Sequence, residues 1–166
     1  MTREIKSDYL KNISEVINSL GLRISSYDFE RPWGGFFVID EDQAQKFANI
    51  YFDGKNIEDL QIAGKLSPKI LAIQPHSKLS WQYHHRRSET WRVIEGPVGI
   101  IRSMSDVQTE AEILKKGDVI TLKNRQRHRL IGQENWALVA EFWQHTDKRN
   151  PSNEEDIIRL EDDYQR

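Results

Sequence analysis

The sequence contains no cysteine, which excludes disulfide bonds, thiolate metal sites and cysteine nucleophiles together. It also lacks long hydrophobic runs: residues 1–6 lead into no apolar segment of the secretion-signal type, and no stretch approaches the length of a membrane span. Neither sign of charge is in excess, because 24 Lys and Arg stand against 26 Asp and Glu. This balance gives no electrostatic case for nucleic-acid binding. We therefore expect a soluble, cytoplasmic protein with neither membrane nor nucleic acid as its partner.

Internal repeats and low-complexity segments are absent as well, and the remaining composition is that of a folded protein. The chain has 166 residues, of which 10% are aromatic and 30% are charged. This length suffices for one domain with a hydrophobic core and is too short for two ordinary domains. We expect a single domain that spans residues 1–166.

An amphipathic helix is predicted for residues 4–20. Its hydrophobic residues recur at spacings of three and four, the pattern of one helix face. They are Ile5, Tyr9, Ile13, Val16, Ile17 and Leu20. Gly21 then stands where a helix commonly ends in a left-handed residue. The polar face mixes both signs of charge, so we expect packing on the outside of a domain and not on a membrane surface.

Short strand-like segments dominate residues 22–145, which favours a β-sandwich or closed barrel. Turn residues separate them, as in 31–35 and at Gly117. The predicted strands are 36–39, 69–73, 79–83, 90–94, 98–104, 110–114, 119–122, 127–131 and 136–143. Residues 40–66 mix helix and turn signals, and we expect them to leave the barrel and cover its mouth.

The tail carries a local helix signal. Ser152 and Glu155 have the spacing of a capping box, in which two side chains satisfy the free N–H groups at a helix start. A short carboxy-terminal helix is therefore predicted over residues 152–163.

Three types of metal ligand lie within eight residues at Gln82, His84 and Glu89. The first two are two positions apart, so on a strand they point to the same face, and Glu89 can return to that face after a short turn. His128, which follows a basic loop at 123–127, supplies a second half-site. Two imidazoles, a carboxylate and an amide oxygen suit Zn²⁺, Mn²⁺, Fe²⁺, Co²⁺ or Ni²⁺ and do not choose among them.

These spacings resemble the two motifs of the cupin family. Gln82-x-His84-x4-Glu89-x6-Gly96 is similar to the first motif, with Gln in the place of its first His. The resemblance implies a mainly β cupin barrel, or jelly roll, with a metal held by Gln82, His84, Glu89 and His128. Cupins often pair through their sheets, so it also implies a homodimer.

The second cupin motif is met with two departures. Gly117-x5-Lys123-x-Arg125-x2-His128 keeps its spacing, although Lys and Arg replace its Pro and Gly. Such spacing is typical of the fold and says little about any one activity.

A closer resemblance is to the type II mannose-6-phosphate isomerases, a module that follows a nucleotidyltransferase domain in many bacteria. Residues 79–91 are similar to the family signature L-S-L-Q-x-H-H-H-R-A-E-H-W. Residues 31–34 match its R-P-W-G, Lys69 matches the Lys of its K-R-I strand, and 155–166 match its closing D-D-I-x-R-x-E-D-x-Y-G-R. Arg86 and Thr90 stand where the family has histidines.

This resemblance implies a metal-dependent isomerase that interconverts mannose 6-phosphate and fructose 6-phosphate through an enediol, with zinc as the first expected ion. The reaction needs an electrophile at the substrate oxygens, a base for the carbon acid and a cation for the phosphate. Arg87 and Arg159 match family arginines, and Lys69 is a candidate for phosphate contact or proton transfer. These three are the expected catalytic residues, and the sequence names no base.

Several alternatives stay open. A cupin that binds a sugar or sugar phosphate without converting it is favoured by Arg86 and Thr90, and an isomerase or epimerase for another phosphosugar needs the same residues. An iron dioxygenase fits less well, because Gln in a ligand position and nearby arginines suit phosphate chemistry better. Arg159 can equally be an exposed helix residue paired with Glu155, and the loop 123–129 can be an anion site or simply solvated.

Overall fold

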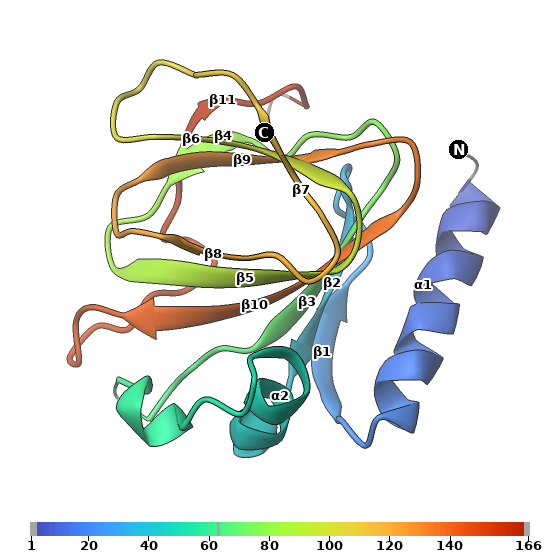
Figure 1. The fold of residues 1–166 in the computed structure, drawn as a ribbon, viewed down its shortest axis with the longest axis vertical. Helices are drawn as coiled ribbons and strands as arrows, with labels where there is room; N and C mark the ends of the chain where they lie inside the picture. The colour runs from blue at the N-terminus through green and yellow to red at the C-terminus, as the bar shows by residue number, and fades with distance from the viewer. Residues whose placement is uncertain (1–2, 63, 165–166) are drawn as a thin grey trace.

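Two facing antiparallel sheets form the body of the protein in the computed structural model, which describes residues 3–62 and 64–164 (Figure 1). The helices are α1 (Arg3–Ser19) and α2 (Ala44–Tyr51), with single 3-10 turns at Glu41–Gln43 and Ile57–Asp59. The strands are β1 (Ile24–Asp28), β2 (Gly34–Ile39), β3 (Lys69–Ile73), β4 (Trp81–Tyr83), β5 (Arg87–Glu95), β6 (Val98–Ser103), β7 (Glu112–Leu114), β8 (Val119–Leu122), β9 (Arg127–Gly132), β10 (Ala137–His145) and β11 (Ile158–Glu161).

One sheet has the strand order β1-β2-β3-β10-β5-β8 and the other has the order β11-β4-β9-β6-β7. Side chains alternate between the faces of each strand, so every second residue points into the space between the sheets. The mainly β barrel with an amino-terminal helix, predicted from the sequence, is confirmed.

Apolar side chains pack in two layers, one on each face of the six-stranded sheet. The inner layer lies between the sheets and includes Trp33, Leu71, Trp91 and Val139. The outer layer joins the helices to β2, β3 and β10. Strand β3 is consequently buried along its whole length, which explains why its residues 70–73 are all hydrophobic.

Helix α1 is present as predicted and packs on the outer layer, although its buried face differs in part from the expected one. Leu10 and Ile17 are fully buried, whereas Val16 is about half exposed. Gly21 ends the helix with φ of +80°, the left-handed conformation expected there. Neither α-helix among the described residues is long and apolar enough to cross a membrane.

The prediction that residues 40–66 cover the barrel mouth is wrong. This segment forms α2 and the two 3-10 turns, and its Phe47, Phe52 and Leu66 belong to the outer layer beneath the six-stranded sheet (Figure 1). None of its described residues lines the cavity between the sheets. The physical reason is the apolar face of α2, which buries more surface against β3 and β10 than it would over a polar opening.

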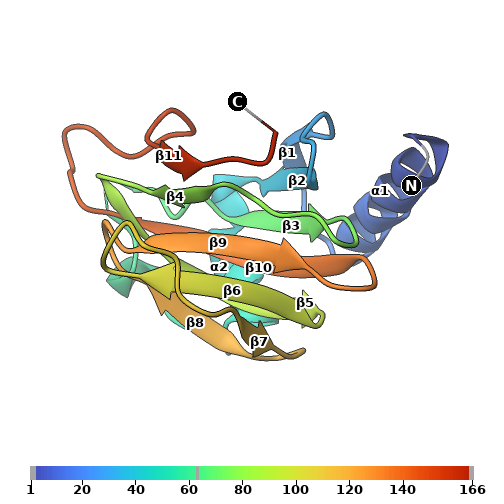
Figure 2. The ribbon, with the colours of Figure 1, turned by 90° about the horizontal axis from the view of Figure 1, so that it is seen from above.

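The predicted carboxy-terminal helix at 152–163 is also wrong, because the tail forms strand β11 beside β4 (Figure 2). The hydroxyl of Ser152 donates to the carboxylate of Asp156 at 2.6 Å and does not cap a helix. Ile158 and Arg159 instead pair with Tyr83 and Gln82, completing the edge of the five-stranded sheet.

Candidate metal centre

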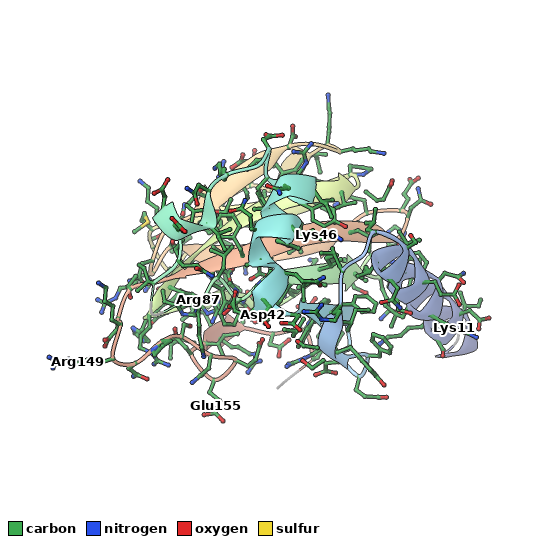
Figure 3. All side chains as sticks on the ribbon, turned by 90° about the horizontal axis from the view of Figure 1, so that it is seen from below. Lys11, Asp42, Lys46, Arg87, Arg149 and Glu155 are labelled. Carbon is green, nitrogen blue, oxygen red and sulfur yellow. The ribbon has the colours of Figure 1, made fainter. Side chains whose placement is uncertain are left out.

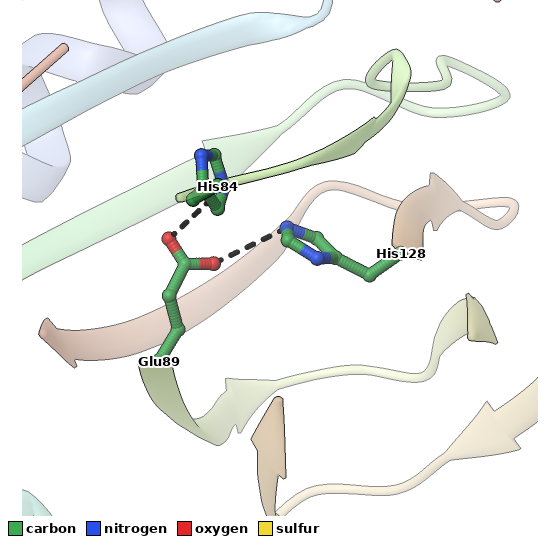
Figure 4. A group of neighbouring side chains, drawn as sticks. All are labelled: His84, Glu89 and His128. Carbon is green, nitrogen blue, oxygen red and sulfur yellow. Dashed lines mark ion pairs between the residues drawn. The ribbon is translucent and has the colours of Figure 1, made fainter. Parts of the chain in front are cut away.

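Strands from both sheets bring His84, Glu89 and His128 together between them (Figure 4). All three are buried, and one ligand atom from each lies within 4.8 Å of the others. Glu89 Oε2 lies 3.6 Å from His84 Nε2, and Glu89 Oε1 lies 3.3 Å from His128 Nε2. His128 lies on β9 and His84 directly follows β4, both in the five-stranded sheet, whereas Glu89 lies on β5 in the other sheet.

The side-chain amide of Gln82 completes the group. Its Nε2 atom lies 3.4 Å from Nε2 of both His84 and His128, while Oε1 accepts from the hydroxyl of Ser80 at 2.5 Å. The two ends of an amide are assigned from such contacts, and a hydroxyl can either donate or accept. Reversing the amide would therefore turn its oxygen toward the imidazoles and keep the bond to Ser80.

These separations match the size of a divalent ion. Ligands about 2.1 Å from a shared ion in a tetrahedral arrangement lie about 3.4 Å apart. The four atom pairs given above are 3.3 to 3.6 Å apart. With one ligand atom from each of His84, Glu89 and His128 within 4.8 Å of the others, these spacings suit a shared ion once the Gln82 amide is reversed.

Hydrogen bonds on the far side of each imidazole select the tautomer that a metal needs. His84 Nδ1 lies 2.7 Å from the backbone oxygen of Asp156, and His128 Nδ1 lies 3.2 Å from the backbone oxygen of Gln126. A carbonyl oxygen accepts only, so each Nδ1 carries the hydrogen and each Nε2 presents a lone pair toward Glu89.

Electrostatics hold these groups in the protonation states of metal ligands. Burial lowers the pKa of His84 to about 3, so the imidazole is neutral. Although burial alone would raise the pKa of Glu89, the Arg87 guanidinium holds that pKa well below its usual range. A neutral imidazole and an anionic carboxylate are the forms that bind a cation.

Arg87 is buried, and its guanidinium is directed at protein groups. Nε donates to Glu89 Oε2 at 3.0 Å, and Nη2 lies 3.2 Å from His84 Nε2. Nη1 donates to the hydroxyl of Ser152 at 2.9 Å and to the backbone oxygen of Asn153 at 3.0 Å. The structure therefore places Arg87 as a link between Glu89 and the tail.

Lys69 lies in the wall of the same cavity. Its Nζ pairs with the half-exposed carboxylate of Glu154 and sits 4.7 Å and 4.1 Å from the ring centroids of Phe36 and Trp143. Burial lowers the pKa of Lys69 to about 8. This side chain can consequently gain or lose a proton close to neutral pH, as a proton-transfer group must.

Glu141 is a site residue that the sequence reasoning missed. It is buried on β10, pairs in register with Lys69 on one side and Trp91 on the other, and lines the cavity. Burial, and then the neighbouring Glu89 carboxylate, raise the pKa of Glu141 to about 8. The sequence does carry a signal for it, because Glu141 is an acidic residue flanked by the apolar runs 137–140 and 142–143 of one predicted strand. Carboxylates are rarely buried unless they are paired or functional.

Arg159 reaches the cavity from β11, and Arg31 reaches it from the turn before β2. The full lining is Arg31, Trp33, Phe36, Lys69, Leu71, Leu79, Gln82, Arg87, Glu89, Trp91, Glu141, Trp143, Glu154, Ile157 and Arg159. Four cationic side chains and three glutamates thus line one cavity, and its cations offer contacts to an anionic ligand.

Arg86 and Thr90, where the sequence departs from the isomerase signature that it resembles, are not among the residues that line the cavity. Thr90 lies on β5 directly after Glu89, so it points to the opposite face, where its hydroxyl is 3.4 Å from that of Thr121. The Arg86 backbone N–H donates to Asp156 at 3.0 Å. Neither departure removes a group from the candidate site.

The buried ammonium group of Lys69 predicts a pH dependence of stability. Because its folded pKa is about 8 and its ordinary value is 10.5, the unfolded chain holds more protons between these values. The free energy of unfolding of the wild type, relative to Lys69→Met, should therefore rise as the pH increases through this window, by at most about 3 kcal/mol. Urea unfolding of both proteins at pH 7 and pH 10 measures it, and a difference that stays constant would contradict the shifted pKa.

Comparison with known proteins identifies a sequence family for most of the chain. The family described as mannose-6-phosphate isomerase C-terminal matches residues 40–162. A search of curated proteins finds no match.

Similar solved structures have low sequence identity. The capsular polysaccharide assembling protein CapF from Staphylococcus aureus is 13% identical, with a TM-score of 0.54 over 84% of this chain and 34% of CapF. CapF with the inhibitor 3-isopropenyl-tropolone is 14% identical, with a TM-score of 0.55. A cupin-superfamily sugar phosphate isomerase from Silicibacter pomeroyi is 14% identical, with a TM-score of 0.42 over 48% of this chain and 50% of that one. The chain spans about a third of the length of CapF, and this similarity shows a shared fold alone.

Proposed function

We propose that this chain, which belongs to the mannose-6-phosphate isomerase C-terminal family, is a metal-dependent sugar-phosphate isomerase. The observation that carries the proposal is the buried group of Gln82, His84, Glu89 and His128, of which Gln82 and Glu89 also line a cavity that carries four cationic side chains. An ion held there would supply a Lewis acid for the carbonyl and hydroxyl oxygens of an open-chain sugar. The specific reaction that we propose interconverts mannose 6-phosphate and fructose 6-phosphate, with zinc as the first ion to test.

The isomerisation moves a proton between C2 and C1 of the open-chain sugar, while a hydroxyl proton moves between the two oxygens. We assign the proton transfers to Glu141 and Lys69, because both line the cavity and both have pKa values of about 8. A group whose pKa lies near the operating pH can accept a proton in one step and return it in the next.

Arg159 and Arg31 are our candidates for the phosphate, since both residues line the cavity and a guanidinium group has the planar geometry that suits phosphate oxygens. Arg87 is assigned a different role. Its Nε and Nη1 donors are already directed at Glu89 and the tail, so we propose that it orients Glu89.

The proposal is tested with purified protein loaded in turn with Zn²⁺, Mn²⁺ and Co²⁺ and supplied with mannose 6-phosphate. We expect fructose 6-phosphate to form, and Glu141→Gln to keep its bound ion while losing about 10²- to 10⁴-fold in kcat, the usual contribution of a proton-transfer group. Chelated wild-type protein is the control for the ion, and glucose 6-phosphate tests the choice of sugar.

Two outcomes would contradict this assignment. Tight binding of mannose 6-phosphate without turnover, with every ion, would identify a binding protein in place of an isomerase. Turnover of another phosphosugar at a higher kcat/KM would keep the reaction class and replace the substrate.

A further inference from the structure

The tail loop, residues 152–156, lies against the segment that carries His84 and Arg87, although the two are far apart in the sequence. It leads directly into β11, which lies beside β4 at the edge of the five-stranded sheet (Figure 2). Hydrogen bonds from this loop reach two of the groups that shape the metal centre.

The first path runs through Asp156, which is 4% exposed. Its backbone oxygen lies 2.7 Å from His84 Nδ1. Its carboxylate accepts from the backbone N–H of His85 at 2.9 Å, from that of Arg86 at 3.0 Å and from the hydroxyl of Ser152 at 2.6 Å. The side chain thus clamps the residues directly after His84 and thereby fixes the carbonyl that orients the imidazole.

The second path runs through Arg87. The hydroxyl of Ser152 and the backbone oxygen of Asn153 accept from Nη1, while Nε of the same guanidinium donates to Glu89. Ser152 joins the two paths, because its hydroxyl also donates to Asp156. A displaced tail loop would therefore release both an imidazole and a carboxylate of the centre.

We propose that the tail loop is a structural part of the metal centre, with Asp156 as its positioning residue. This inference rests on the metal binding of the proposed function and adds that ion binding and tail docking are coupled. Mutation of a residue that hydrogen-bonds a metal ligand on the side away from the ion commonly lowers metal affinity by about 10- to 100-fold. Coupling is reciprocal, so an ion that binds more tightly when the loop is docked must also favour the docked loop.

The experiment titrates Co²⁺ into the metal-free wild type and three variants, with affinity read from the visible absorption of the bound ion. Asp156→Ala should weaken Co²⁺ binding about 10- to 100-fold, and Asp156→Asn, which keeps one acceptor oxygen, should weaken it less. The matched control is Glu155→Ala, whose exposed side chain projects from the surface in Figure 3 and whose removal should leave affinity unchanged. Circular dichroism confirms that each variant is folded.

Hydrogen exchange of the wild type gives a second measurement that does not depend on a variant. Co²⁺ should slow exchange at the amides of His85 and Arg86, which donate to Asp156. Two results would overturn the role of the tail loop and leave the metal centre standing. One is wild-type Co²⁺ affinity in folded Asp156→Ala and Asp156→Asn, and the other is an exchange rate at these two amides that Co²⁺ does not change. A wild type that binds no ion would overturn the proposed metal centre and this inference with it.

Discussion

The variant His84→Ala with His128→Ala is expected to purify with metal at background level, while the wild type binds close to one ion per chain. The two imidazoles supply both nitrogen ligands of the centre, and their Nε2 atoms converge on Glu89 at 3.6 and 3.3 Å. Structural zinc sites with four ligands bind with roughly 10–16 kcal/mol in zinc-finger peptides, and on that scale the loss of two ligands removes roughly 5 kcal/mol or more. This corresponds to at least about a thousandfold in Kd.

The control for this experiment is His85→Ala. His85 follows His84 directly but is exposed, and its hydrogen bond to Asp156 comes from the backbone N–H, which alanine keeps. Metal content measured by mass spectrometry should therefore equal that of the wild type. A double variant that stays folded and retains its ion would show that the ligand set is wrong.

The variant Arg87→Met is expected to lower the free energy of unfolding of the metal-free protein by about 3–5 kcal/mol. The Arg87 and Glu89 side chains are 5% and 3% exposed and lie 3.0 Å apart. Removing one partner of a buried ion pair leaves the other charge without compensation, and that penalty falls in this range. Urea unfolding at neutral pH in the presence of a chelator measures it.

Two further variants separate the charge effect from simple loss of packing. Arg86→Met removes a neighbouring guanidinium that is 27% exposed and 3.9 Å from its carboxylate partner, and it should cost no more than about 1 kcal/mol. Arg87→Met with Glu89→Gln removes both buried charges and should recover a large part of the loss. The single variant Glu89→Gln completes the comparison. If the double variant loses as much free energy of unfolding as Arg87→Met and Glu89→Gln lose together, the pairing of Arg87 with Glu89 is not what stabilises this site.

The sequence predicted the four candidate metal ligands because their positions follow the alternation of side chains along strands. Gln82 and His84 share a face for the simple reason that side chains alternate along a strand, and β4 brings both toward His128. The same alternation turns Thr90 away from Glu89, so a departure from the family that looks serious in the sequence lies outside the cavity.

Local signals misled where a distant partner decided the structure. The Ser152 and Glu155 spacing predicted a helix, yet the tail pairs with β4 and Ser152 bonds to Arg87 and Asp156. Helix signals are local, whereas a strand forms only if an open sheet edge is present to receive it, and no short sequence window contains that edge.

The sequence by itself determined the barrel, the metal-ligand residues to be tested and the family, because strand alternation and motif spacing are properties of short segments. Only the tertiary structure decided the roles around them. It set Glu141 between Lys69 and Trp91 across three strands, turned Arg87 toward Glu89, and folded Asp156 against His84. The contacts of Glu141 and Asp156 join residues from different strands or from distant parts of the chain, whereas Arg87 and Glu89 share β5 and Arg87 is held there by the distant Ser152 and Asn153. The burial of Glu141 and Lys69 and their shifted pKa values therefore result from packing. The ligands in residues 80–91 depend in the same way on groups from β10 and the tail that the fold places beside them.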